Sequence, residues 1–209
     1  IGNPENAVAQ TKEGGDQFFF SLQDAIDTAY VTGYEIYILR DFEATYALNI
    51  KEDYDITINM SSYDITTGND ILINGKLHLY DSSEDVGSIT SAKSIVNNGT
   101  LNISDINIKT TKDVVTITNN GTLNLVNSTI EGTSKVAVDT YGEITMDENT
   151  VLKGVNYALA NHQEELELST GTIYGVQNYK KVTINEGVTL IGSNDDACVL
   201  TYGNTEVNY

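Results

Sequence analysis

Pairs of apolar residues with one residue between them recur along this chain at intervals of 16 to 25 residues. Each pair has a period of two, which is typical of a β-strand whose alternate side chains face one core. The pairs are Ile36/Ile38, Ile56/Ile58, Leu77/Leu79, Leu101/Ile103, Leu123/Leu125, Ile144/Met146, Leu166/Leu168, Val182/Ile184 and Val207/Tyr209.

Two further apolar positions accompany most of these pairs. One lies six residues before the first member of the pair, at Ile71, Ile95, Ile117, Val138 and Val176. The other lies seven residues after it, at Ile108, Ile130, Val151 and Ile173. Each period therefore predicts three short strands, which is the pattern of a β-solenoid. Leucine-rich repeats share the period, but they need leucines at fixed offsets that this chain lacks.

The turn before each pair also repeats, and the segment NNGTLNI at Asn97 returns as NNGTLNL at Asn119. Glycines fall two residues before the pair at Gly75, Gly99, Gly121 and Gly142. This position predicts a bend with positive φ, which glycine adopts most readily. Asparagine, the next most tolerant residue, precedes three of these glycines, and we expect the turn asparagines to stack as hydrogen-bonded ladders.

One helical segment interrupts the strand pattern near the start of the chain. Its apolar face comprises Leu22, Ala25, Ile26, Ala29 and Tyr30. We expect a capping helix over residues 17–34 that covers the first coil, because an open solenoid end exposes apolar side chains and strand edges. Residues 1–16 are expected to be a polar linker and residues 35–209 the solenoid. The last residues, EVNY, read as a strand, which suggests a truncated C-terminal edge able to associate with another copy.

Composition narrows the possible partners. The 209 residues include 30 acidic and 11 basic side chains, for a net charge of −19, which disfavours nucleic acid. No apolar run reaches the length of about 20 residues that a transmembrane helix needs, so membrane insertion is not expected. Cys198 is the single cysteine, and no disulfide can form within the chain.

The motif xxIxNNGTLNIxxxxI, after a helix and the segment YEIYILRDF, resembles the right-handed parallel β-helix of adhesin-like bacterial and archaeal surface proteins. The broader fold is similar to the pectin lyase-like superfamily. The resemblance covers residues 17–209 and is best between Ile71 and Ile173. It implies an all-β fold, a right-handed parallel β-helix of about eight to nine coils with an N-terminal capping helix. For function it implies either a surface module or a polysaccharide-active enzyme.

The residues that an enzyme of this fold would need are sparse. Arg40 is the sole arginine, and it follows the first strand pair rather than a middle coil. Asp195 and Asp196 are the one adjacent aspartate pair, without the basic companions of a polygalacturonase-like site. His162 lies beside two glutamates in a turn, where a solvated role is expected. We therefore expect no catalytic residues.

Two kinds of binding site remain open. Acidic turns offer oxygen ligands that suit Ca²⁺, although none has a regular ligand spacing, and no other cofactor is expected. The tentative metal ligands are Asp81, Glu84, Asp85, Asp195 and Asp196. The chain also has 13 tyrosines against four phenylalanines and no tryptophan. Tyrosines near turns of the last coils are candidate sugar-binding residues, namely Tyr141, Tyr157, Tyr174, Tyr179 and Tyr202.

Together these patterns predict a non-catalytic, extracellular, adhesin-like module for adhesion or presentation at a cell surface, with a glycan or another host-surface ligand as partner. One alternative is a divergent polysaccharide lyase or glycoside hydrolase-like domain. A second alternative is a purely structural stalk.

Overall fold

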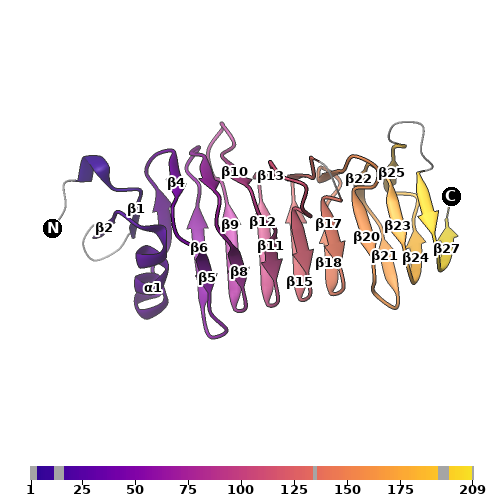
Figure 1. Cartoon of the computed structure of the whole chain (residues 1–209), viewed down its shortest axis with the longest axis horizontal. Coiled ribbons are helices and arrows are strands. Elements are labelled where there is room, and N and C mark those ends of the chain that lie inside the picture. The colour runs from indigo at the N-terminus through magenta and orange to yellow at the C-terminus, as the bar shows by residue number, and fades with distance from the viewer. Residues whose placement is uncertain (1–3, 12–16, 134–135, 193–197, 209) are drawn as a thin grey trace.

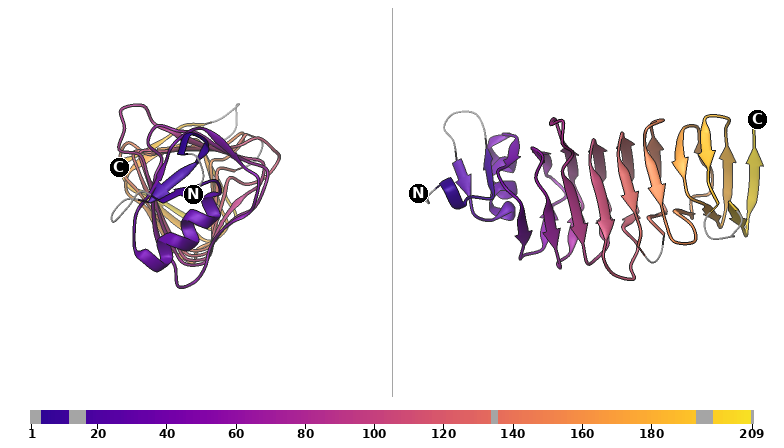
Figure 2. Two further views of the ribbon diagram at one scale, coloured as in Figure 1. Left: turned by 90° about the vertical axis from the view of Figure 1, so that its left-hand side faces the viewer. Right: turned by 90° about the horizontal axis from the view of Figure 1, so that it is seen from above.

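The computed structural model describes residues 4–11, 17–133, 136–192 and 198–208, which form a parallel β-solenoid (Figure 1). Successive coils stack along one axis into a straight rod, with the single α-helix at the N-terminal end. Viewed along the axis, the coils have a three-sided outline (Figure 2). Each coil contributes one strand to each of three faces, which we call A, B and C. The predicted all-β solenoid with three strands per coil is confirmed.

The strand bounds show how regularly the coils repeat. Face A contains β3 (Ile36–Ile38), β6 (Asp55–Asn59), β9 (Lys76–Tyr80), β12 (Thr100–Ser104), β15 (Thr122–Val126), β18 (Glu143–Met146), β21 (Leu166–Leu168), β24 (Lys181–Ile184) and β27 (Asn204–Val207). Face B contains β4 (Phe42–Ala44), β7 (Ile65–Thr67), β10 (Ser88–Ser91), β13 (Asn107–Thr110), β16 (Thr129–Glu131), β19 (Val151–Lys153), β22 (Gly171–Ile173) and β25 (Val188–Leu190). Face C contains β5 (Leu48–Ile50), β8 (Ile71–Ile73), β11 (Ile95–Asn97), β14 (Ile117–Asn119), β17 (Val138–Thr140), β20 (Leu159–Asn161), β23 (Val176–Asn178) and β26 (Val199–Thr201).

Faces B and C are each one sheet of eight parallel strands. Face A is divided, because β21, β24 and β27 form a separate three-stranded sheet. The solenoid therefore has eight complete coils in faces B and C, within the range that the sequence predicts.

A helix is present in the segment expected to form the cap, but α1 spans Leu22–Thr32 rather than residues 17–34, because residues 17–19 form a strand. Ser21 accepts a hydrogen bond from the backbone N–H of Asp24, and Gly33 ends the helix with a φ of 70°. Leucine, alanine and isoleucine side chains of one helix face are buried on the first coils. Tyr30 was expected on that face, but it is 45% exposed and stacks instead on Tyr54, with ring centroids 4.2 Å apart.

Within the segment expected to be a polar linker (residues 1–16), the described residues 4–11 form regular structure. A 3₁₀ turn, η1 (Pro4–Asn6), precedes β1 (Ala9–Thr11), which pairs antiparallel with both β3 and β2 (Gln17–Phe19). Ala7 and Ala9 are buried, so the segment covers the edge of face A that the first coil would otherwise expose. None of the helices in the described ranges has the length and hydropathy of a membrane span.

The register of the coils corrects three sequence assignments. Ile58, not Ile56, lies opposite Ile36. On face B the buried partner of Ile130 is Leu152, whereas the predicted Val151 is only half-buried. In the last coil Val207 lies opposite Ile184, so it is the second member of its pair, and Tyr209 lies outside the described residues. The register therefore differs from the sequence assignment by one position at Val151 and by two positions at Ile56 and Val207.

The repeated glycines are explained by a close approach rather than by positive φ, which corrects the sequence prediction. Positive φ occurs in the described glycines Gly33, Gly171 and Gly175. A Cβ on Gly99 would instead lie 1.9 Å from the carbonyl oxygen of Gly75 in the preceding coil. The glycine column therefore lets successive coils stack at the strand spacing.

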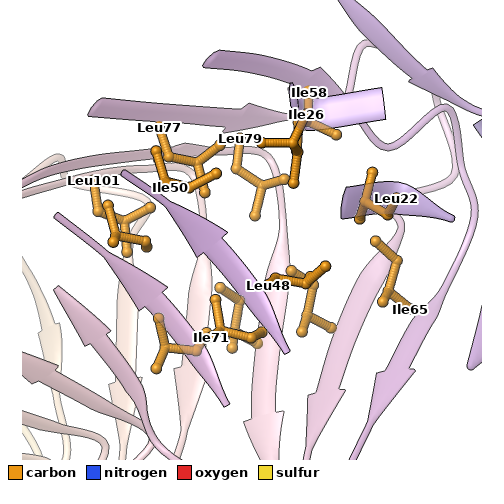
Figure 3. Close-up of a pocket in the computed structure, with 14 residues that line it drawn as sticks. Leu22, Ile26, Leu48, Ile50, Ile58, Ile65, Ile71, Leu77, Leu79 and Leu101 are labelled. Atoms are coloured by element: carbon orange, nitrogen blue, oxygen red, sulfur yellow. The ribbon is translucent and has the colours of Figure 1, made fainter. Parts of the chain in front are cut away.

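The core is a continuous column of isoleucine, leucine and valine side chains. Beneath α1 these side chains leave an apolar void of ≈ 30 Å³, lined by residues such as Leu22, Leu48 and Leu79 (Figure 3). No polar group lines this void, so it lacks the partners that a water molecule or a polar ligand would need.

Candidate functional site

The corner between faces C and A carries a column of stacked aromatic rings. Tyr141, His162, Tyr179 and Tyr202 each directly follow a strand of face C in four successive coils. Neighbouring ring centroids lie 4.4, 4.3 and 5.2 Å apart, and the ring planes differ by 6°, 11° and 13°. We call these four residues the aromatic column.

The same corner carries asparagines in earlier coils. Asn98 donates a hydrogen bond to Asn74 and Asn120 donates one to Asn98, both at 2.8 Å, which confirms the predicted exposed ladder. A second, buried ladder lies behind it, in which Asn97 donates to Asn119 at 2.8 Å and Asn119 donates to Thr140 at 3.0 Å. The buried ladder fixes the corner, and the exposed position changes from amides to rings at Tyr141.

A groove runs along the outer side of face C beside the aromatic column, with a volume of ≈ 520 Å³. Its floor is formed by Asp139, Ala160 and Gln177, which are register partners on adjacent strands. His162 and Tyr179 form one wall. The opposite wall comes from the turns between faces B and C, and consists of Asp113, Val115, Val136, Asn156 and Tyr157.

Asp139 has the most altered environment in the groove. Its carboxylate oxygen Oδ1 lies 3.0 Å from Nε2 of His162, and the Asp139 side chain is 21% exposed. Burial raises the pKa of Asp139, and the opposing effect of His162 does not cancel this shift. The charge of Asp139, together with burial and Tyr179, in turn raises the pKa of Tyr141. A carboxyl with a raised pKa inside a groove is a frequent mark of a functional site.

The five predicted tyrosines fall into three different settings. Tyr141, Tyr179 and Tyr202 belong to the aromatic column, and Tyr157 lies in the opposite wall of the groove. Tyr174 packs against the core, with Nζ of Lys153 6.0 Å from its ring centroid. The structure thus brings four of the five tyrosines to the groove or its rim and separates Tyr174 from them.

His162 is the member of this site that sequence reasoning missed. It was assigned to a solvated turn, yet it is 25% exposed and lies between Tyr141 and Tyr179. The available signal was its position directly after a strand of face C, which the neighbouring coils fill with tyrosine. The stacking also restricts how a sugar can approach, because both ring faces of His162 and Tyr179 are covered by neighbouring rings. The edges and hydroxyl groups of the column remain for contacts.

The acidic turns give less support for a metal. Asp81 is buried and accepts backbone hydrogen bonds from Ser62, Ser83 and Gly87 at 2.8 to 2.9 Å. Burial opposes its ionisation, but these three N–H donors outweigh burial and lower the pKa of Asp81. Its carboxylate therefore holds the turn together, while Glu84 and Asp85 are exposed.

Asp195 and Asp196, the other tentative metal ligands, lie outside the described residues. Within the described ranges, no group of three or more His, Cys, Asp or Glu side chains is placed to hold a metal ion. The thiol of Cys198 is half-buried and free.

Comparison with models of protein families found no match, and comparisons with curated proteins and with solved structures found none either.

Proposed function

We propose that this chain is a non-catalytic, adhesin-like module at a cell surface, which binds glycans in the groove of face C. The resemblance of its repeat to β-helices of adhesin-like surface proteins, within the pectin lyase-like superfamily, supports the extracellular setting. The solenoid would serve as a rigid scaffold that presents the groove.

The observation that carries this proposal is the composition of the groove. It combines aromatic side chains, Tyr157 and Tyr179, with planar polar groups on Asn156, Asp139 and Gln177. Sugar recognition uses this combination, because the ring of Tyr157 can pack against apolar C–H surfaces while amides and carboxylates hydrogen-bond the hydroxyl groups. Tyr179, whose ring faces are covered by His162 and Tyr202, contributes its ring edge and hydroxyl group. The net charge of −19 favours neutral or cationic glycans over polyanionic ones.

A glycan-array screen of the full chain, with calcium and again with a chelator, tests the proposal. We expect reproducible binding that weakens in Tyr157→Ala. Tyr63→Ala is the matched control, since Tyr63 is a half-exposed tyrosine in a turn far from the groove. Loss of binding on chelation would add a calcium requirement. No binding across the array would refute the proposal and favour the structural stalk.

A polysaccharide-active enzyme is the second candidate, and Asp139 is the observation that favours it. Its raised pKa suits a general acid, and Asp113 supplies another carboxylate in the same groove. Incubation with soluble polysaccharides, followed by measurement of new reducing ends or unsaturated products, distinguishes the candidates. Product formation that disappears in Asp139→Asn would establish the enzyme.

A further inference from the structure

The floor of the groove presents three different side chains in sequence along the solenoid axis. Asp139, Ala160 and Gln177 are paired in register across β17, β20 and β23. Adjacent strands are about 4.8 Å apart, so the carboxylate and the carboxamide are attached about 10 Å apart. The methyl group of Ala160 lies between them, and we call this stretch of the groove floor the hollow.

Both polar ends of this hollow have unused hydrogen-bonding capacity. Within the described residues, no hydrogen bond involves the carboxamide of Gln177. Oδ1 of Asp139 is buried and accepts no hydrogen bond of good geometry, although Nε2 of His162 lies only 3.0 Å away. The two atoms are within ion-pair distance but are not aligned as a hydrogen bond. A ligand that supplies a donor at Asp139 would complete the site.

The charges of the residues that line the groove indicate which kind of ligand group would donate a hydrogen bond to Asp139. Among the described lining residues, Asp113 and Asp139 are carboxylic acids, His162 is a histidine, and none is lysine or arginine. A partly buried carboxylate in such a setting favours a cation over a neutral hydroxyl group, because charge-assisted hydrogen bonds are the stronger kind.

We propose that the groove selects an amino sugar, whose ammonium group binds Asp139 while its ring lies over Ala160 toward Gln177. This inference rests on the proposed glycan-binding function and specifies its ligand class. Tyr157 and Tyr179 line the two walls of the groove on either side of the hollow. A ligand of several units would extend along the axis, parallel to the aromatic column.

Calorimetric titration with oligomers of glucosamine, N-acetylglucosamine and glucose of equal length tests this inference near neutral pH. We expect the glucosamine oligomer to bind most tightly. Asp139→Asn should weaken its binding by about ten- to a hundredfold, the effect of losing one charged hydrogen bond. Glu186→Gln removes the same charge from an exposed turn and should leave binding unchanged.

The possible outcomes separate this inference from the proposed function. If Asp139→Asn and Glu186→Gln bind the glucosamine oligomer as the wild type does, the attraction is a general effect of net charge and the inference is wrong. If the neutral oligomers bind better and lose affinity in Tyr157→Ala, glycan binding holds but amine selection fails. If no oligomer binds the wild-type chain, both are refuted.

Discussion

Nε2 of His162 lies 3.0 Å from Oδ1 of Asp139, one full coil away along the chain. The contact joins the aromatic column to the floor of the groove, because the imidazole also stacks between Tyr141 and Tyr179. A single substitution at Asp139 or His162 therefore affects both the aromatic column and the floor of the groove.

Asp139 makes the stability of the chain depend on pH. Burial raises the pKa of this carboxyl above 3.8, so the folded chain binds the proton more tightly than the unfolded chain does. The stabilising contribution of protonated Asp139 is complete below 3.8 and is lost as the pH rises through the folded pKa. Asp139→Asn should therefore gain stability relative to the wild type over that pH range.

Thermal melting of both proteins across the acidic range measures this difference. Glu186→Gln, which changes an exposed side chain, should differ from the wild type by a small and constant amount. A difference between Asp139→Asn and the wild type that does not change with pH would contradict the assignment.

The aromatic column should contribute measurably to stability. Tyr179→Ala removes one ring contact with His162 and another with Tyr202. Stacked pairs contribute about 0.5–1.5 kcal/mol each, so we expect a loss of about 1–3 kcal/mol in the free energy of unfolding. Tyr179→Phe keeps both ring contacts and should lose little. Urea denaturation compares the variants, and an equal loss in both would show that the hydroxyl group, not stacking, matters.

The glycine column should tolerate no side chain. Gly99→Ala places a Cβ 1.9 Å from the carbonyl oxygen of Gly75, which forces two coils apart. Overpacking of this kind should cost about 3 kcal/mol. Gly68→Ala is the control, because a Cβ there has no atom within 4 Å and should change stability by about 0.5 kcal/mol or less. Similar midpoints of denaturation for the two variants would be evidence against the close-approach explanation.

The two asparagine ladders should differ in their importance, although Asn119 and Asn120 are adjacent. Asn119 is buried and donates to Thr140 Oγ1 at 3.0 Å and to the Glu143 carbonyl at 2.8 Å. Asn119→Leu leaves these groups unsatisfied and should cost about 3 kcal/mol. Asn120→Ala removes an exposed amide and should cost about 0.5 kcal/mol. Chemical denaturation of both variants checks the ranking, which a larger loss at Asn120 would reverse.

The fold could be predicted because every coil satisfies the same local constraint. Leu101 and Leu123 occupy the same place in successive coils and pair in register. The repeat period of the apolar pairs was therefore enough to identify the strands that contain them. The prediction failed where turns change length, as at Val151, because alternation cannot show which residue of a run faces inward. It also misread the glycines, since a close contact with the preceding coil leaves the same sequence signature as a positive φ.

The groove was harder to predict than the fold. Tyr157 and Tyr179 were identified individually, but their places on opposite walls depend on turn geometry that periodicity does not encode. The pairing of Asp139 with His162 needs the register of β17 against β20, and neither residue belongs to a local motif. One signal in the sequence could have placed His162 at this site: like Tyr141, it directly follows a strand of face C.

Ala160 provides the sharpest test of the groove as a binding site. It lies on β20 between its register partners Asp139 and Gln177 and lines the groove, although it is only 4% exposed. Ala160→Leu should fill the hollow and abolish glycan binding without changing any hydrogen-bonding group. Ala92→Leu, in a turn away from the groove, is a control for added apolar volume. Binding should be lost in the first variant and kept in the second, whereas retained binding in Ala160→Leu would place the ligand elsewhere. Circular dichroism and thermal melting would verify that both variants remain folded, so that lost binding reports the hollow and not the scaffold.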